Sequence, residues 1–411
     1  MNQPGRRLWR KVAYGIGAVI ALMAGVVIWF VFLGGVALTD RAMLWRMIRG
    51  IEAEPPAAIE VSRLLTVPEG FEISLWATGL PSARILTPLP TGDLLLTQPR
   101  GGLVTWLQAD RDGDGRSDGQ QVLRANLDRP NGIDYHEGWL YIAEATRVVR
   151  FRFDPEQPAL GEPEVLIDGL TADGGHWRKT VRVGPDGKLY LGQGSTCNVC
   201  LEADPRRATV MRFTLEGEEG VLVASGTRNP YGFDWTPWDQ RLYATENGRD
   251  LLGDDLPPDE LNHIIEGGFY GWPHVHGKDI KDPKWAEGYA ERIAAALPPA
   301  HEFGAHVAPL GIRFLRHPER AAAHARTALV ALHGSWNRST PSGYEVVALH
   351  FDDRGAISEQ TFVGGFRQPD QLIGRPVDVA EGADGTIYIT DDYAGAVYQV
   401  RASGVPSTDP D

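Results

Sequence analysis

Three short stretches of the chain carry residue types that can do chemistry together. His176 lies in GGHWRKTVRVGPDGKLYLGQG, Arg228-Asn229-Pro230 lie in SGTRNPYGF about fifty residues later, and GGFYGWP follows at 267–273. An imidazole can act as a general base, and a guanidinium can bind a carboxylate or a developing oxyanion. Each stretch lies just before or after a turn-and-strand unit of similar design, so a repeating fold can bring them to one place.

The elements that must position these residues are repeated strands. A polar or glycine-containing turn introduces an apolar strand in PTGDLLLTQ, EGWLYIAEA, PDGKLYLGQ, PWDQRLYATEN, ARTALVALHG and ADGTIYITDD. Neighbouring apolar runs such as VVRFRFD and AVYQVRA predict further antiparallel strands. Most units recur every 46 to 58 residues, which suits four-stranded blades. The sequence therefore predicts an all-β fold, a six-bladed β-propeller.

One spacing, between Leu242 and Leu329, is nearly doubled. We expect residues 253–305 to be an insertion over one end of the propeller, with a short helix near 285–296. The propeller itself is expected over 63–403, because that length is too great for a small sandwich and suits one closed ring. Residues 404–411 are expected to form a disordered tail.

The N-terminal region carries a membrane signal. An uncharged run of 27 residues covers 12–38, which as a helix is long enough to cross a bilayer core of about 30 Å. The basic segment 1–11 before it predicts a cytoplasmic N-terminus, so the body would lie in the periplasm of a bacterium, at the inner membrane. We expect an uncleaved N-terminal transmembrane helix, with a cleavable signal peptide as the alternative, followed by a juxtamembrane linker over 39–62.

The charge of the chain argues against one class of partner. The formal net charge is −14, and the four basic residues within 1–11 leave the rest of the chain more acidic still. Such a surface disfavours nucleic acid. It is compatible with bound calcium and with a basic electron acceptor.

The chain has two cysteines, Cys197 and Cys200 in STCNVCLEAD. Leu201 follows the second one, where covalent haem attachment needs a histidine, and no further zinc ligands are obvious nearby. In an oxidising compartment the simplest state is a local disulfide, with a reduced or redox-active pair as the alternative.

A second cluster of ligand-type residues lies in DRDGDGRSDGQQ. Asp110, Asp112 and Asp114 occupy positions 1, 3 and 5 of a calcium-type loop, Gly115 occupies position 6, and Asp118 falls at position 9. Gln121 stands at position 12, where glutamate normally closes the site. The pattern is typical of either a structural calcium ion or a solvated acidic turn.

These stretches together resemble a known family. From about Val67 to Val400 the chain is similar to the quinoprotein glucose/sorbosone dehydrogenases, six-bladed propellers that use pyrroloquinoline quinone (PQQ) and calcium to oxidise sugars. STCNVC, ENGRDLLGDDLPPDEL, EGGFYGWP and LHGSWNRSTPSGY resemble the sorbosone-dehydrogenase-like branch. The combination of RNP, GGxYGWP and a histidine before GPDGKLY is specific, whereas each alone is weak.

The resemblance implies roles for single residues. His176 matches the catalytic base, and Arg228 and Asn229 match residues that hold PQQ. Arg228 is also expected to be catalytic, because a guanidinium suits the C5 oxygen of the quinone as negative charge develops. Arg375 matches an arginine that reaches the cofactor from the last blade, and Thr196 stands where relatives use a glutamine. The family's PQQ-contacting lysine has no counterpart near Gly334, so His333 and Arg338 are candidates to replace it. The family's second arginine is Val377 here.

The resemblance also implies calcium sites. The main-chain carbonyls of Gly248 and Arg249 match the loop that binds the catalytic calcium. Glu260, Tyr270 and Asp279 fall near the positions of a second calcium ion.

The resulting hypothesis is a membrane-anchored, periplasmic, PQQ- and calcium-dependent sugar dehydrogenase that passes electrons to a quinone or cytochrome. Two alternatives stay open. LDRPNGIDYHEGWLYIAEA, which contains Asn131, resembles part of the calcium-dependent gluconolactonase-type propellers. A non-catalytic propeller that serves as a binding scaffold is the other.

Overall fold

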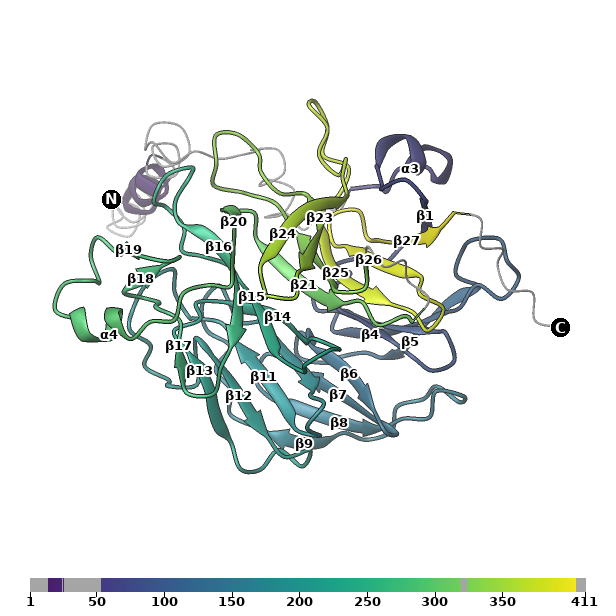
Figure 1. Ribbon diagram of the computed structural model, residues 1–411, viewed down its shortest axis with the longest axis horizontal. Helices are drawn as coiled ribbons and strands as arrows, with labels where there is room; N and C mark the ends of the chain where they lie inside the picture. Colours follow the sequence, from purple (N-terminus) through teal and green to yellow (C-terminus); the bar gives the residue numbers. More distant parts are fainter. Residues whose placement is uncertain (1–13, 24, 26–52, 319–323, 404–411) are drawn as a thin grey trace, which may run out of the picture.

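A computed structural model gives the fold and describes residues 14–23, 25, 53–318 and 324–403. Six sheets lie around a central axis (Figure 1). Each innermost strand contacts the innermost strands of the two neighbouring blades. Around the ring their order is β2, β6, β10, β14, β21 and β25, and β25 contacts β2 to close it. The predicted six-bladed β-propeller is confirmed.

The blades follow one another along the chain. The first contains β2 (Leu86–Pro88), β3 (Leu94–Gln98), β4 (Leu103–Gln108) and β5 (Gly119–Arg124). The second contains β6 (Ile133–His136), β7 (Trp139–Ala143), β8 (Val148–Arg152) and β9 (Glu164–Ile167). The third contains β10 (Lys179–Val183), β11 (Leu189–Gln193), β12 (Thr209–Phe213) and β13 (Val221–Ser225), with β17 (Gly268–Phe269) added in parallel at its edge.

The other three blades complete the ring. The fourth contains β14 (Pro230–Trp235), β15 (Leu242–Glu246), β16 (Pro258–Ile264) and β20 (His301–Ala305). The fifth contains β21 (Pro309–Phe314), β22 (Thr327–Leu332), β23 (Glu345–Phe351) and β24 (Ile357–Val363). The sixth contains β25 (Pro376–Glu381), β26 (Ile387–Asp391), β27 (Ala396–Ala402) and the N-terminal strand β1 (Phe71–Ala77).

Each repeated unit of the sequence is the second strand of a blade, namely β3, β7, β11, β15, β22 and β26. These strands are nearly continuous apolar runs because a neighbouring blade covers each face, and every residue of β3, β11, β15, β22 and β26 is buried. The core between blades one and two shows the pattern, since Leu95 and Val104 pack with Leu140 and Phe151.

A repeated aspartate links the innermost strands of neighbouring blades. Each of these aspartates lies on an inner strand and accepts a backbone N–H from an inner strand of the next blade at 2.7 to 2.9 Å: Asp134 from Val183, Asp234 from Phe314, and Asp378 from Leu86. Inner strands of different blades do not share a sheet, so these backbone N–H groups would otherwise be buried without a hydrogen-bond partner.

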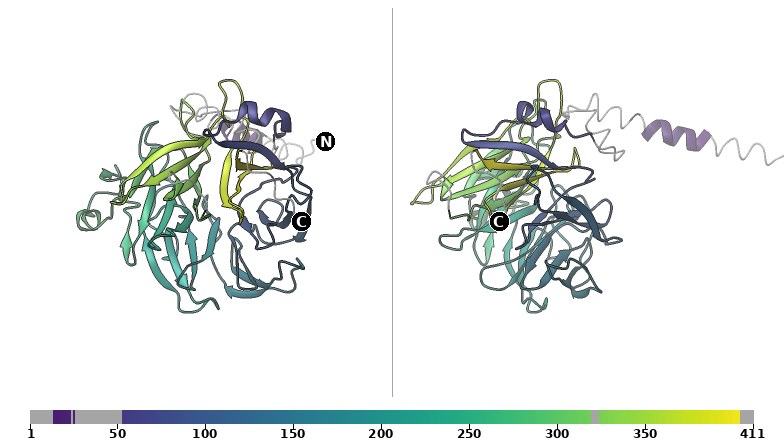
Figure 2. Two further views of the ribbon diagram at one scale, coloured as in Figure 1. Left: turned by 45° about the vertical axis from the view of Figure 1, so that its right-hand side comes forward. Right: turned by 90° about the vertical axis from the view of Figure 1, so that its right-hand side faces the viewer.

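The sixth blade closes the ring by joining the two ends of the propeller. β1 pairs antiparallel with β27, and Ile73 lies opposite Val400. A short helix, α3 (Ala58–Leu64), packs beside β1 through the buried Val61 (Figure 2). The predicted boundary between linker and propeller at residue 63 therefore falls inside a helix that belongs to the propeller core.

The expected insertion over 253–305 needs a correction. This range supplies β16 and β20, the two outer strands of the fourth blade, and only the segment between them is extra. That segment holds β17, the small hairpin of β18 (Val275–His276) and β19 (Ile280–Lys281), and α4 (Ala290–Ala294). β16 escaped notice because prolines and acidic residues precede it and interrupt the apolar pattern.

The membrane prediction receives no support from the structure. Within the described part of the chain, no helix is long and apolar enough to cross a membrane. Residues 14–23 and 25 of the predicted span 12–38 are helical and exposed, and its other residues lie outside the described ones, as do 1–11 and 404–411.

Candidate active site

A cavity of about 570 Å³ opens at one end of the propeller. Its volume lies within the range of about 300 to 1,000 Å³ that is typical of small-molecule sites. All six blades contribute to its wall, and each contributes residues that precede its innermost strand. Most of them lie just before an innermost strand or just after a second strand, while Tyr231, Leu310 and Asp259 lie on β14, β21 and β16.

The segments before the innermost strands supply a ring of cationic or imidazole side chains. They are Arg84 before β2, Arg129 before β6, His176 and Arg178 before β10, Arg228 before β14, His306 before β21, and Arg375 before β25. Pro230 and Pro376 begin two of these strands, and the residue before a proline is usually restricted to an extended backbone. Local sequence thus fixes the direction in which Asn229 and Arg375 enter the cavity.

His176 has a defined tautomer. Its Nδ1 lies 3.1 Å from the carbonyl oxygen of Ser195 and 2.9 Å from the Ser195 hydroxyl oxygen. A carbonyl oxygen can only accept a hydrogen bond, so Nδ1 carries the proton and Nε2 keeps its lone pair. Burial, and then the positive charge of Arg228, lower the pKa of His176 to about 3. The imidazole is therefore neutral at physiological pH and can accept a proton through Nε2.

The backbone around His176 is held by a second layer of cations. Arg207 donates to the carbonyl oxygens of His176 and Ser195 at 3.1 and 2.9 Å. Lys179 is 1% exposed and donates to the carbonyl oxygens of Ala145, Thr171 and Trp177. Both side chains point into the loop instead of the cavity, and both hold His176 in position.

Gly194 allows the close contact between His176 and Asn229. A Cβ atom on Gly194 would lie 2.4 Å from Asn229 Oδ1 and 2.6 Å from His176 Cβ, which is closer than real Cβ contacts. Only glycine fits there. The residue after β11 therefore brings together two residues that are more than fifty positions apart in the chain.

Arg228 is buried and fully bonded. Its guanidinium donates to the carbonyl oxygens of Asn247 and Gly248 at 3.0 and 2.7 Å, and it pairs with Asp250 at 2.7 Å. It also donates to the main-chain and side-chain oxygens of Asn198. Arg228 lines the cavity as predicted, but every N–H of its guanidinium is directed to the protein.

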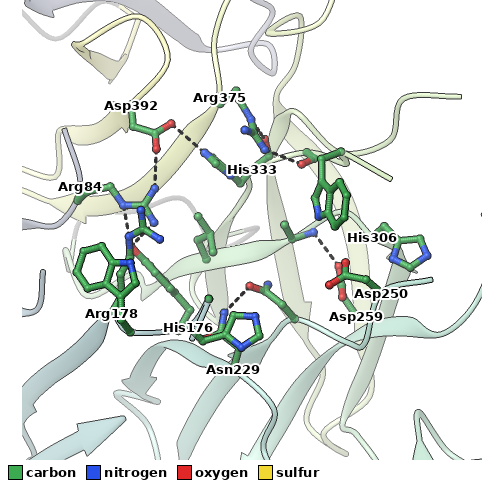
Figure 3. A pocket seen from close by; sticks show the side chains of 18 of the residues that line it. Arg84, His176, Arg178, Asn229, Asp250, Asp259, His306, His333, Arg375 and Asp392 are labelled. Atoms are coloured by element: carbon green, nitrogen blue, oxygen red, sulfur yellow. Dashed lines mark hydrogen bonds and ion pairs between the residues drawn. The ribbon is translucent and has the colours of Figure 1, made fainter. Parts of the chain in front are cut away.

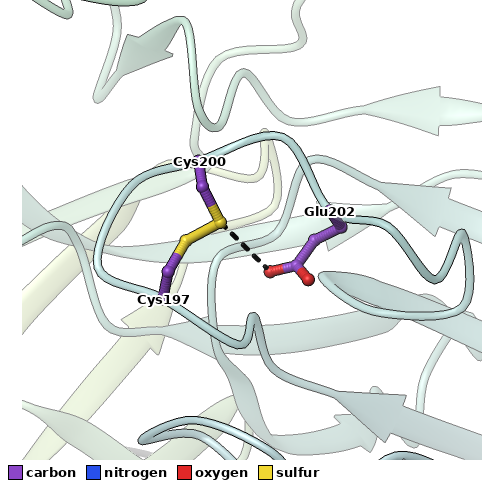
Figure 4. A group of neighbouring side chains, drawn as sticks. All are labelled: Cys197, Cys200 and Glu202. Carbon is purple, nitrogen blue, oxygen red and sulfur yellow. Dashed lines mark hydrogen bonds between the residues drawn. A yellow bond between two sulfur atoms is a disulfide. The ribbon is translucent and has the colours of Figure 1, made fainter.

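The loop that holds Arg228 from the other side contains the predicted disulfide. Cys197 and Cys200 are bonded to each other (Figure 4), so the prediction is confirmed, and their sulfur atoms do not act as thiolate ligands beside Glu202. Thr196 donates to Glu202 through both its N–H and its hydroxyl. Thr196 does not line the cavity, so its predicted contact with a cofactor is not supported by this arrangement.

The opposite wall of the cavity is rich in oxygen. Figure 3 shows Asp250, Asp259 and His306 across the cavity from Arg84 and Arg178. Asp259 accepts the N–H groups of Gly248 and Ala308 at 2.6 and 2.7 Å, and burial raises its pKa to about 7.

The resemblance places the catalytic calcium ion at this wall, on the carbonyls of Gly248 and Arg249. Carboxylate and carbonyl oxygens are the ligands that calcium prefers. Gly248 lines the cavity, but its carbonyl already accepts a hydrogen bond from Arg228. Arg249 does not line the cavity, and its side chain pairs with Asp282. The Gly248 carbonyl is thus committed to Arg228 in this arrangement, and the catalytic calcium site stays a prediction.

The residues predicted for a second calcium ion are not brought together by any contact among the described residues. Glu260 is buried and accepts the N–H of Gly277 and a side-chain N–H of Asn262, and burial raises its pKa to about 7. The hydroxyl of Tyr270 donates to the carbonyl oxygen of His263, and Asp279 is exposed.

The Asp110 loop connects β4 with β5 and lies away from the cavity. Carboxylate oxygens of Asp110, Asp112 and Asp118 lie within 4.8 Å of one another, whereas Asp114 bonds to the N–H of Arg116. The Asp110 side chain is 1% exposed, and its Oδ1 has no hydrogen-bond partner in the described part of the chain.

The two candidates to replace the missing lysine are engaged elsewhere. His333 lines the cavity and bonds to Asp392 at 2.9 Å, and burial, with Arg375 nearby, lowers its pKa to about 4. Arg338 does not line the cavity and donates to the carbonyl oxygens of Asp254 and Thr340. Arg375 does line it and donates to the carbonyl oxygens of His333 and Gly334.

Comparisons with known proteins agree with this architecture. The family model for glucose/sorbosone dehydrogenase matches residues 137–399. An uncharacterised protein of Borreliella burgdorferi is 30% identical over 360 residues, which cover 84% of this chain and 92% of that protein. The chain belongs to the glucose/sorbosone dehydrogenase family. The resemblance stated from the sequence is thus confirmed.

Two further similar proteins are named as quinone-dependent sugar dehydrogenases. Quinoprotein glucose dehydrogenase B of Acinetobacter calcoaceticus is 26% identical over 51% of this chain and 51% of its own length, so the chain spans about half of that relative. The solved holo form of the pyranose dehydrogenase PQQ domain of Coprinopsis cinerea has a TM-score of 0.70 and 20% identity, and covers 82% of this chain and 97% of that domain. This second likeness shows the fold.

The cavity of this family member fits PQQ, a planar quinone that carries several carboxylates. The arginine ring offers the charge that carboxylates need, and Arg178 Nε is buried without a hydrogen-bond partner among the described residues. Arg228, Asn229 and Arg375 are in place to line such a ligand. Binding of an anion here would offset the charges that lower the pKa of His176.

Sequence reasoning missed several residues of the cavity wall. Asn247 and Asp392 directly follow β15 and β26, two of the repeated strands that the sequence did reveal. Their place after the repeat was therefore a usable signal. Arg84 and Asp259 had no such signal, because Arg84 follows no repeated strand and Asp259 lies on β16, whose apolar pattern is interrupted.

Proposed function

We propose that the protein is a PQQ-dependent sugar dehydrogenase of the aldose or sorbosone type, with His176 as the general base. One observation carries the proposal: a neutral imidazole, with Nδ1 held by Ser195 and Nε2 free to accept, lines a cavity ringed by arginines. PQQ, when bound, supplies a quinone that accepts hydride from C1 of the sugar.

The side chains of this chain have two tasks in that reaction. His176 Nε2 accepts the proton of the anomeric hydroxyl, while Ser195 holds the ring through Nδ1 and keeps the tautomer fixed. The new imidazolium would face repulsion from Arg228, which burial intensifies. An anionic ligand in the cavity reduces that repulsion and makes His176 a stronger base.

The decisive experiment is a titration of the apoprotein with PQQ in the presence of calcium, followed by a panel of sugars with an artificial electron acceptor. His176→Gln should lower kcat by about 10² to 10⁴ and leave the Kd for PQQ nearly unchanged, because a general base contributes about that much. His301→Gln is the matched control, since His301 pairs with Glu359 away from the cavity. Absence of PQQ binding, or full turnover by His176→Gln, would overturn the proposal.

The lactonase alternative gains no support from the geometry. Asn131 is 1% exposed, and its side chain accepts from Tyr231 and donates to the carbonyl oxygen of Lys179. It is thus committed to the propeller core. Among the described residues that line the cavity, no group of histidines and carboxylates gathers with metal-ligand spacing.

The location and partners belong to the same proposal. The uncharged run at 12–38 after a basic segment motivates an inner-membrane anchor with the propeller in the periplasm, and the disulfide agrees with an oxidising compartment. A quinone or cytochrome at the membrane would then take the electrons. Fractionation of cells that express the full chain tests this location, and recovery in the cytosol would contradict it.

A further inference from the structure

The cationic residues of the cavity wall differ in how their charge is balanced. Arg84 pairs with Asp392 at 2.6 Å, Arg129 with Asp128 at 3.1 Å, and Arg228 with Asp250 at 2.7 Å. Arg375 is bonded to two carbonyl oxygens of the fifth blade. Four arginines of the ring are therefore satisfied by the protein itself.

Arg178 is the exception. Its half-buried side chain lines the cavity, its guanidinium carbon lies 4.7 Å from the centre of the Trp177 ring, and its Nε is buried without a hydrogen-bond partner. No ion pair joins it to any acidic side chain in the described ranges. Burial and the neighbouring Arg84 lower its pKa to about 10, which still leaves it charged at neutral pH.

A partly buried cation without an acidic partner is unfavourable, so a site of this kind favours an anion. Asp392, an acidic residue of the same cavity wall, does not pair with Arg178, because its carboxylate already bridges Arg84 and His333. Figure 3 shows Arg178 beside Arg84, on the wall opposite the acidic Asp250 and Asp259. A ligand carboxylate on this side would meet cations and avoid those acids.

We propose that Arg178 binds a carboxylate of the cofactor and so provides the cation for which the sequence offers no lysine. This inference rests on the proposed function and deepens it. The planar guanidinium can donate two parallel N–H bonds to a carboxylate, and Trp177 limits its freedom through stacking. Its position two residues after His176 also ties cofactor binding to the base, because both side chains leave the same loop.

The experiment measures the Kd of the apoprotein for PQQ by absorbance titration, which does not depend on turnover. Arg178→Gln should weaken binding about ten- to a hundredfold, since a hydrogen bond to a charged group is worth roughly that factor. Arg178→Lys keeps the charge but loses the paired N–H groups, so its Kd should lie between those of the unaltered protein and Arg178→Gln. Circular dichroism tests whether both variants are folded. If Arg178→Gln does not fold, the Kd of Arg178→Lys tests the inference instead.

Arg152→Gln is the matched control. Arg152 is also stacked on a tryptophan, 3.6 Å from the Trp139 ring centre, but it is exposed and lies outside the cavity. Arg152→Gln removes the same charge as Arg178→Gln and should leave the Kd for PQQ unchanged. An equal Kd for Arg178→Gln and the unaltered protein would overturn the inference while leaving the proposed function intact.

Two other results are equally informative. If the unaltered protein binds no PQQ, the proposed function fails and this inference fails with it. If Arg178→Gln keeps its affinity for PQQ but loses activity on uronic acids more than on neutral aldoses, Arg178 recognises the carboxylate of a substrate, and the assignment to the cofactor is wrong.

Discussion

At the scale of single residues, the site depends on how protons and charges are held before any ligand arrives. Ser195 fixes the tautomer of His176, and Gly194 admits the contact between His176 and Asn229. Burial, and then the same cations that prepare the cavity for an anion, lower the pKa of His176 and keep it neutral. Ligand charge and base strength are therefore linked, because each carboxylate that enters reduces the repulsion on the imidazolium.

This linkage predicts how His176 titrates. In the apoprotein burial, and then Arg228, lower its pKa to about 3, so the imidazole should stay neutral as the pH falls through 6.5 and gain its proton only near pH 3. PQQ should raise this pKa. Two-dimensional NMR of labelled histidines measures both values, with the His176 signal assigned by its loss in His176→Gln. A titration near 6.5 in the apoprotein would contradict the described environment.

At the scale of elements, the sequence was most informative where local pattern and burial coincide. The second strand of each blade was readable because neighbouring blades bury both of its faces. Outer strands such as β5 and β9 are partly exposed and carry a weak pattern. The outer strands of the fourth blade, β16 and β20, were wrongly assigned to an insertion. The long segment that separates them in the chain carries β17, β18, β19 and α4 and hides their relation.

The candidate site was predictable only in part, for a physical reason. His176, Arg228, Asn229, Arg375 and Gly248 lie on its wall as expected. The sequence could not reveal which cation remains without a partner, because that depends on pairs such as Arg84 with Asp392, which are 308 residues apart. Thr196, Arg249 and Arg338 entered the prediction by alignment of motifs, and their side chains turn to local partners instead.

The Asp110 loop gives a prediction about metal binding. It contacts the closing blade, since Gly115 O accepts from Gln399 Nε2 at 2.6 Å and Arg401 lies 3.5 Å from Asp110. Calcium at a hundred times its Kd should stabilise the fold by about 2.7 kcal/mol. Asp112→Asn with Asp118→Asn should abolish that gain in thermal unfolding, whereas Asp353→Asn, at an exposed ion pair, should not. An unchanged gain in the double variant would show that calcium binds elsewhere.

At the scale of the whole molecule, the cavity exists only when the ring is closed. Its wall draws on all six blades, and the inner strands contact one another around the full circle. The sixth blade is built from both ends of the propeller, with β1 more than three hundred residues from its partner β27. Loss of this pairing would free the ends of the ring and separate Arg84, just after β1, from Asp392, just before β27.

Ring closure can be tested at Ile73, which is 6% exposed and packs in the core of the sixth blade opposite Val400. Ile73→Ala should lower the free energy of unfolding by about 2 to 5 kcal/mol, because it removes buried methyl groups and leaves a cavity. Glu72→Ala, the neighbouring exposed position on β1, should change it by less than about 0.5 kcal/mol. Urea unfolding followed by tryptophan fluorescence measures both. Equal stabilities for the two variants would mean that β1 is not needed to hold the ring together, and the cavity would then have to be stabilised by the inner strands alone.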